Sequence, residues 1–363
     1  MFKPNYQITN NLLTYISRIE QAKALIENSP LVPAWENQFR NEAMERTAHY
    51  GTKIEGNDLT REQAHQILIS DSVNSKRASL DADVIARERD IQELINYRNV
   101  VLWIDRQEKN YSQKLLSEET LKILHTLTME KLIEDKYLGQ YRDKQVIIKS
   151  VADGSIIFRP PHFLEVPLLT KDFFDWLNYP PTINIHPILK AAISHYQLVF
   201  IHPFIEGNGR SARAMATLIS YVANYDFKKF FSLEEYFDKD VNAYYQALLS
   251  VQKNQDDNLT YWLEYFCYGL ALEIDKIKQK VLRLSQDLKL KQQLGQQVAL
   301  SERQIILLEI LQQQGEITSD EAQQAIPNVS VDTLLRDLKD LINKGVIAKK
   351  GVTKGVRYIL KES

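Results

Sequence analysis

The chain has 363 residues, of which 44% are hydrophobic and 25% are charged. This length predicts two or three domains, each large enough to bury an interior of its own. The net charge of −2 provides no overall attraction to nucleic acid or to an acidic membrane, so any such binding must be local. A single cysteine, Cys267, excludes an internal disulfide and a zinc site built from several thiolates.

The N-terminal residues lack a basic segment followed by an apolar core, which is the pattern of a secretory signal. Apolar runs along the chain are also shorter than the roughly 20 residues that cross a bilayer. We therefore expect a soluble cytoplasmic protein without a membrane segment.

Glycine and proline are scarce, with 12 and 11 copies, and long amphipathic stretches dominate, so the fold class is expected to be mainly α. The first such stretch has apolar or small residues every three or four positions: Trp35, Phe39, Ala43, Thr47, Tyr50 and Ile54. This spacing predicts a helix with one buried stripe that ends at Glu55-Gly56. A carboxylate there faces the negative end of the helix dipole, so another group should hold Glu55.

A β-hairpin is predicted between residues 145 and 159. Two β-branched runs, 146–148 and 156–158, flank Asp153-Gly154, which is a strong turn signal. The pattern predicts a two-stranded flap in an otherwise helical region.

Residues 202–213 read HPFIEGNGRSAR and lie between two largely apolar segments, 191–201 and 214–222. We expect these segments to form two buried helices with the polar residues between them. Gly207-Asn208-Gly209 can bring backbone amides close to an anion, and the helix that starts near Gly209 directs its positive end to the same place. Arg210 and Arg213 share one face of that helix, where a polyanion would relieve their mutual repulsion.

Two further residues of this motif have catalytic potential. Glu206 offers hard oxygen ligands that suit Mg²⁺ bound to phosphates. His202 precedes Pro203 at the end of the apolar segment, and an imidazole that titrates near neutrality could take a hydroxyl proton there. The other six histidines are expected to be satisfied core residues: His49, His65, His125, His162, His186 and His195.

The remaining sequence predicts a connecting helix and a small C-terminal domain. Residues 271–297 carry Lys, Gln and Leu at helical spacing. From Ser301 onward, the order is helix, short strand 316–318, helix 319–325, a helix capped by Ser330 and two final strands, which resembles a winged helix-turn-helix. Residues 301–363 contain nine basic and nine acidic side chains, so this domain has no net charge that would attract DNA. Two interpretations stay open: a domain that binds a specific DNA sequence, and a domain for dimerisation or partner docking.

Residues 202–213 match the Fic family signature HPFx(D/E)GN(G/K)RxxR at every defined position. The chain resembles Fic proteins over most of its length, with an N-terminal helical region at 1–105, a catalytic core at 106–270, a connecting helix at 271–300 and a winged helix at 301–363. The resemblance implies transfer of AMP from Mg·ATP to a Ser, Thr or Tyr hydroxyl of a target protein. The kinase-like branch of the family has Lys in place of Gly209, so this chain resembles the adenylyltransferases.

The resemblance also implies roles for individual residues. His202 would be the general base, Glu206 the metal ligand, and Asn208 with the amides of Gly207 and Gly209 the anion hole. Arg210 would hold a phosphate and Arg213 would contact the γ-phosphate. Tyr244 and Tyr245 resemble the adenine-pocket tyrosines, although helical spacing favours the core for one of them. The flap at 145–159 would present the target protein as an added strand.

The family's inhibitory motif, (S/T)xxxE(G/N), resembles the segment from Gly51 to Gly56. Glu55 and Gly56 match, whereas Gly51 departs from Ser or Thr at the first position. The resemblance implies that Glu55 pairs with Arg213 and denies this arginine to the γ-phosphate.

Two alternative functions remain open at this point: removal of AMP from a modified target, with Glu55 aligning a water, and a nucleotide-sensing DNA-binding regulator. Related proteins often form dimers, so the choice between a monomer and a homodimer is also open. The target protein and its hydroxyl type are not specified by the sequence.

Overall fold

The computed structural model describes residues 2–70, 79, 82, 84–107, 114, 116–149, 156–253, 256–293, 300–327, 329–351 and 356–361, with the backbone alone described for 149 and 286–293. The chain divides into two compact units, Met1–Arg283 and Leu284–Ser363. The first unit therefore includes both the N-terminal region and the region expected to hold the catalytic residues.

The first unit is built from helices, in agreement with the expected mainly α class. Its α-helices are α1 Asn10–Asn28, α2 Pro33–Lys53, α3 Arg61–Ile69, α5 Glu88–Arg106, α6 Glu118–Met129, α7 Val166–Leu177, α8 Pro187–Ile201, α9 Asn208–Val222, α10 Leu233–Lys239, α11 Val241–Lys253 and α12 Thr260–Gln293, which continues beyond Arg283. Short 3-10 helices connect them: η3 Asp135–Tyr137, η4 Phe163–Glu165, η5 Pro180–Asn184 and η6 Phe227–Lys229.

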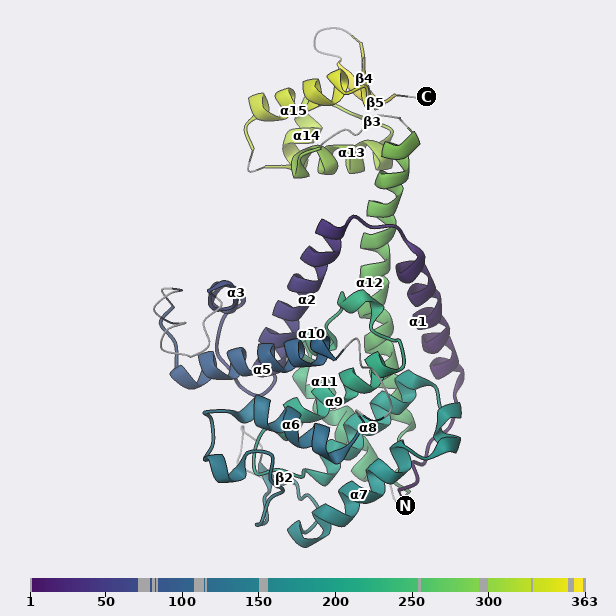
Figure 1. The fold of residues 1–363 in the computed structure, drawn as a ribbon. Helices are drawn as coiled ribbons and strands as arrows, with labels where there is room; N and C mark the ends of the chain where they lie inside the picture. Colours follow the sequence, from purple (N-terminus) through teal and green to yellow (C-terminus); the bar gives the residue numbers. More distant parts are fainter. Residues whose placement is uncertain are drawn as a thin grey trace. The chain divides into compact units, whose positions relative to one another are not determined.

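Helices α8 and α9 lie at the centre of this unit, with α5, α6 and α7 packed around them (Figure 1). Most residues of both helices are buried, as expected from their apolar sequences. Burial on several faces fixes both helices, and the polar loop 202–207 that joins them is held between two rigid supports. The expected arrangement of two buried helices around the motif is confirmed.

Helix α2 begins with Pro33 at its first turn and packs against α5 and α10. Its buried stripe includes Phe39 and Ala43, whereas Trp35 is only partly buried. The helix ends at Lys53, two residues before the expected end, and Glu55 lies in the turn that follows. Gly56 has φ +92°, a conformation that glycine adopts readily.

The two strands of the expected hairpin are present, and they pair in antiparallel orientation. Strand β1 is Ile148–Lys149 and strand β2 is Ile156–Phe158, with Ile148 opposite Phe158. Residues 150–155, including the expected Asp153-Gly154 turn, lie outside the described residues.

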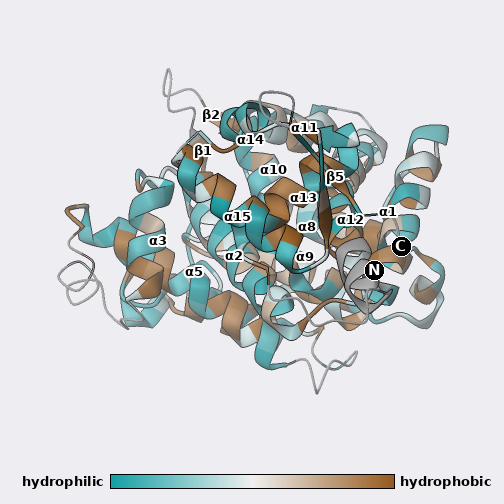
Figure 2. Cartoon of the chain, turned by 90° about the horizontal axis from the view of Figure 1, so that it is seen from above, coloured by the Kyte–Doolittle hydropathy of each residue, from teal (hydrophilic) through white to brown (hydrophobic). Residues whose placement is uncertain are grey.

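The second unit has the element order expected from its sequence: α13 Glu302–Gln314, β3 Glu316–Ile317, α14 Ser319–Ala325, α15 Val331–Asn343, β4 Ile347–Lys350 and β5 Arg357–Leu360. The strands form an antiparallel sheet in the order β3-β5-β4. Brown and teal segments alternate along α15 in Figure 2, and its Leu334, Leu338 and Leu341 are buried in the core of this unit.

The charges of α15 do not favour the phosphate backbone of DNA. Asp337 binds Arg303 at 2.8 Å, and Asp340 accepts a hydrogen bond from Gln304 at 2.7 Å. The winged-helix assignment and its role in DNA binding stay predictions. Within the described part of the chain, no helix combines the length and the apolar character needed to span a membrane.

Candidate active site

His202 caps the C-terminal end of α8 in the left-handed conformation, with φ 52° and ψ 59°. Its Nδ1 lies 3.2 Å from the carbonyl oxygen of Val199, so Nδ1–H donates to that oxygen and Nε2 carries the lone pair. Burial lowers the pKa of His202 to about 4, an effect that the nearby Arg142 reinforces. The imidazole is therefore a neutral base at neutral pH, rather than a group that titrates there as the sequence analysis expected.

The loop between α8 and α9 is closed by the side chain of Asn208. This amide accepts a hydrogen bond from the backbone N–H of Phe204 at 2.8 Å and donates one to its carbonyl oxygen at 2.9 Å. Both ends of the side chain are thus used to shape the loop, and the backbone amide of Asn208 is what it can offer an anion. Gly207 precedes it with φ +75°, and a Cβ there would lie 2.5 Å from Met129 Sδ.

Arg210 and Arg213 project from the first two turns of α9, and each is about 3% exposed. Arg213 Nη2 donates to the Gly51 carbonyl oxygen and to Glu55 Oε1, at 2.8 Å each. The Nε and Nη1 atoms of both arginines are buried and have no hydrogen-bond partner among the described residues. Buried donors without hydrogen bonds are costly, so the two guanidinium groups are candidates for holding an anion, in addition to their ion pairs with Glu93 and Glu55.

Glu55 lies directly over the N-terminus of α9. A Cβ added to Gly209 would be 2.3 Å from Glu55 Oε1, so this carboxylate fills the space above that glycine. Burial alone would raise the pKa of Glu55, but Arg213 and Arg210 outweigh it and lower the pKa. The expected ion pair between Glu55 and Arg213 is present, and a protein carboxylate occupies the anion position at this helix end.

Glu206 is held at both its side chain and its backbone. Its carboxylate forms an ion pair with Arg89 of α5. Its carbonyl oxygen accepts a hydrogen bond from His125 Nε2 at 3.1 Å, while His125 Nδ1 accepts from the backbone N–H of Gly139 at 3.0 Å. His125 also stacks on Phe204 with 3.8 Å between ring centroids, so it supports the loop from beneath.

A buried carboxylate of α5, Glu93, connects several of these groups. Its Oε1 lies 3.4 Å from Arg210 Nη1 and 3.3 Å from Arg89 Nε, and its Oε2 accepts from Asn57 Nδ2 at 3.1 Å. Asn57 follows the turn that contains Glu55, so this network joins that turn to the face of α9 that carries Arg210.

The sequence analysis did not identify Arg89, Glu93, His125 or Arg142 as part of this region. Arg89 and Glu93 stand four apart on a helix, a spacing that is also common for pairs on a solvated surface. Buried Arg142 donates from Nε to the His202 carbonyl oxygen at 2.8 Å and from Nη1 to that of Lys144 at 3.3 Å, which ties the base of the flap to the loop.

Tyr244 and Tyr245 differ in burial, and one of them lies in the core, as the helical spacing predicted. Tyr244 is 1% exposed and is hydrogen-bonded to His195 Nε2 at 2.9 Å, so it belongs to the core. Tyr245 is 40% exposed, and its hydroxyl donates to the Ile54 carbonyl oxygen beside the Glu55 turn at 3.4 Å. Among the other histidines, His65 and His162 are exposed, so the core expectation is wrong for these two.

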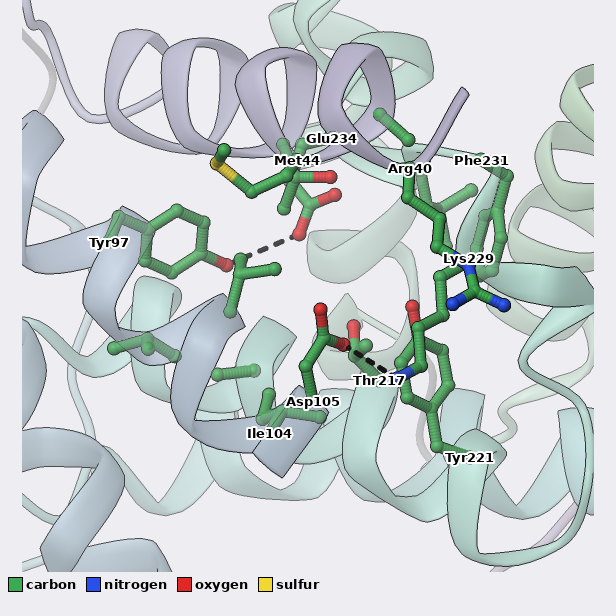
Figure 3. A pocket seen from close by; sticks show the side chains of 16 residues that line it. Arg40, Met44, Tyr97, Ile104, Asp105, Thr217, Tyr221, Lys229, Phe231 and Glu234 are labelled. Atoms are coloured by element: carbon green, nitrogen blue, oxygen red, sulfur yellow. Dashed lines mark hydrogen bonds and ion pairs between the residues drawn. The ribbon is translucent and has the colours of Figure 1, made fainter. Parts of the chain in front are cut away.

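A separate cavity lies among α2, α5, α9 and residues 229–234 (Figure 3). Its charged groups have partners within the protein. Lys229 pairs with Asp105 at 3.2 Å, and the Tyr97 hydroxyl donates to Glu234 at 3.2 Å. By contrast, the Nε and Nη1 atoms of Arg210 and Arg213 make no hydrogen bond within the described residues, which favours the α9 N-terminus as the candidate binding site.

Residues 115–220, which contain the loop and both central helices, match the Fic/DOC family model. The chain carries a Fic domain. It is 32% identical over 177 residues to protein adenylyltransferase fic-1 of Caenorhabditis elegans, covering 47% of this chain and 30% of that protein. It is 28% identical over 190 residues to protein adenylyltransferase Fic of Drosophila melanogaster, covering 51% and 34%.

Solved structures confirm the Fic fold. A Fic family protein from Desulfovibrio desulfuricans aligns with a TM-score of 0.63 and 23% identity, covering 100% of this chain and 99% of that one. Fic-1 from C. elegans aligns with a TM-score of 0.53 and 22% identity, covering 74% and 72%. The chain spans about a third of the length of the curated relatives it matches.

Proposed function

We propose that this protein is an adenylyltransferase that transfers AMP from Mg·ATP to a hydroxyl group of a target protein, and that Glu55 inhibits it. The observation that carries this proposal is the convergence of two buried, incompletely paired arginines, a helix N-terminus and a neutral imidazole around one loop. The names of the curated relatives support the same reaction class.

The residues at the α9 N-terminus fit a triphosphate. Arg210 and Arg213 have buried Nε and Nη1 atoms that make no hydrogen bond within the described residues, and the amides from Gly207 to Gly209 lie at the positive end of α9. Glu206 would supply a carboxylate oxygen to Mg²⁺, which when bound neutralises phosphate charge. Tyr245 is the more accessible tyrosine for contact with the adenine base, since Tyr244 is buried.

His202 would act as the general base. The target hydroxyl oxygen forms a bond to the α-phosphorus, the bond from that phosphorus to the oxygen bridging to the β-phosphate breaks, and pyrophosphate leaves. The hydroxyl proton passes to His202 Nε2, whose lone pair is available because Nδ1–H donates to Val199. The flap would hold the target segment by strand pairing along β1 or β2, and Arg142 links the base of the flap to His202.

Glu55 would inhibit by competing with a phosphate for Arg213. Its carboxylate lies 2.8 Å from Arg213 Nη2 and stays ionised at neutral pH, because the two arginines lower its pKa. A triphosphate could then bind through the remaining donors without engaging Arg213 fully. The reactive placement of the α-phosphorus would require Glu55 to move away.

The test is labelling of the protein and of a cell lysate with α-labelled ATP and Mg²⁺. We expect Glu55→Gly to increase AMP incorporation about tenfold or more, which corresponds to on the order of 1.4 kcal/mol regained at Arg213. Mass spectrometry should find AMP on a Ser, Thr or Tyr side chain.

The matched control is Glu55→Gly combined with His202→Ala, which should abolish labelling while nucleotide binding persists. Unchanged labelling in Glu55→Gly would remove the inhibitory role. Full labelling without His202 would reassign the base.

A further inference from the structure

Arg89 reaches the Glu206 carboxylate from a helix, α5, that lies outside the 202–213 motif. The side chains of Arg89 and Glu206 are 46% and 42% exposed, so the pair can open toward solvent. Glu93 steadies Arg89 with an oxygen 3.3 Å from its Nε, which leaves the outer end of the guanidinium group directed at Glu206.

This contact matters because Glu206 is the residue that would bind the metal ion. A carboxylate oxygen that accepts from a guanidinium group already has a positive partner, and a divalent cation must replace that partner to bind. We propose that Arg89 is a positioning residue that holds Glu206 before the metal arrives and competes with Mg²⁺ for its carboxylate. This inference rests on the proposed function.

The placement of Arg89 is linked to the inhibitory turn. Asn57 Nδ2 donates to Glu93 Oε2 at 3.1 Å and to the Asp90 carbonyl oxygen at 2.9 Å. Glu93 in turn contacts both Arg89 and Arg210. The segment that places Glu55 against Arg213 therefore also steadies Arg89 against Glu206, so one segment acts on both the γ-phosphate arginine and the metal ligand.

The experiment measures binding of Mn²⁺, as a paramagnetic substitute for Mg²⁺, by electron paramagnetic resonance of the full chain. Titrations are made alone and with α,β-methylene ATP, whose α–β linkage cannot be cleaved. Because exposed ion pairs are weak, we expect Arg89→Ala to tighten Mn²⁺ binding by about two- to fivefold. Adding Glu206→Gln to Arg89→Ala should abolish this gain.

Arg106→Ala is the matched control. Arg106 lies at an exposed position in the last turn of the same helix, α5. The substitution removes the same charge from the same helix, and we expect Mn²⁺ affinity to change by less than about 1.5-fold, as for an exposed charge at the other end of the helix.

The outcomes separate this inference from the proposed function. If Mn²⁺ and the ATP analogue bind but Arg89→Ala behaves as wild type, the inference is wrong and the proposed function stands. An equal gain in Arg106→Ala also overturns it, because the effect would then be one of general charge. If neither Mn²⁺ nor the analogue binds to wild type, Glu55→Gly or Arg89→Ala, the proposed function fails and this inference fails with it.

Discussion

Burial of the His202 imidazole determines the pH range in which it can accept a proton. An exposed histidine has a pKa near 6.5, whereas burial lowers that of His202 to about 4. His202 is therefore neutral and able to accept a proton above about pH 4, and it loses this ability only as the pH falls toward that value. Glu55 raises this pKa, so its removal does not restore titration near neutrality.

We therefore predict that kcat/KM of Glu55→Gly, which reports the free enzyme, shows no loss due to His202 between pH 8 and pH 5.5. The measurement is the initial rate of labelling at low ATP across this range. A half-maximal rate near pH 6.5 would show that His202 is more solvated in the active protein than its geometry indicates.

Local and long-range residues differ in how well the sequence predicts them. The residues from His202 to Arg213 lie within twelve positions, so their chemistry could be recognised from the sequence. Arg89 meets Glu206 across 117 positions, and Arg142 meets His202 across 60. Nothing local marks these arginines as different from surface residues, since their roles depend on how α5 and the flap pack. The partnership of Glu55 with Arg213 was foreseen only through the family resemblance.

At the level of elements, α2 packs closely against α5 at Gly51. This is the position where the chain departs from the Ser or Thr of the inhibitory motif. A Cβ on Gly51 would lie 2.2 Å from Cε1 of Tyr97, whose ring is buried and hydrogen-bonded to Glu234. The Tyr97 ring thus occupies the space that a side chain at position 51 would need. Because glycine has no side chain, α2 can lie close to α5, with the Gly51 carbonyl oxygen within reach of Arg213.

We predict that Gly51→Ala destabilises the protein by roughly 1–3 kcal/mol, as overpacking does, although alanine favours helices by up to about 1 kcal/mol over glycine. It should also raise AMP labelling, because a displaced α2 carries Glu55 away from Arg213. Thermal unfolding and labelling measure the two effects.

Asn41→Ala, at an exposed position of the same helix, is the control that improves helix propensity without a clash. A stabilising Gly51→Ala would mean that Tyr97 moves aside easily. The spacing of α2 was predictable from its apolar stripe, but its end at Lys53 was not, because the Glu55 turn is held by contacts with Arg213.

For the whole molecule, histidines at and near the candidate active site make the stability of the first unit depend on pH. Burial lowers the pKa of His125 and His202 to about 4, and it also lowers the pKa of His195 well below its usual value. Below pH 6.5 the unfolded chain binds protons at these residues and the folded chain does not. Stability is therefore fully present above pH 6.5 and falls as the pH drops toward 4, by up to about 1.4 kcal/mol per pH unit for each histidine.

All four tryptophans, Trp35, Trp103, Trp176 and Trp262, lie in the first unit, so their fluorescence follows its unfolding within the intact chain. We predict that urea unfolding followed by this signal shows a loss of several kcal/mol in the free energy of unfolding between pH 7 and pH 5.

His125→Asn should reduce the pH dependence of this free energy by about one proton, even if it lowers stability at pH 7. The reason is that residue 125, which is fully buried, then no longer binds a proton in the unfolded chain. An equal slope in His125→Asn and wild type would mean that folded His125 takes up its proton as readily as the unfolded chain, and hence that its hydrogen bonds to Glu206 and Gly139 open without unfolding.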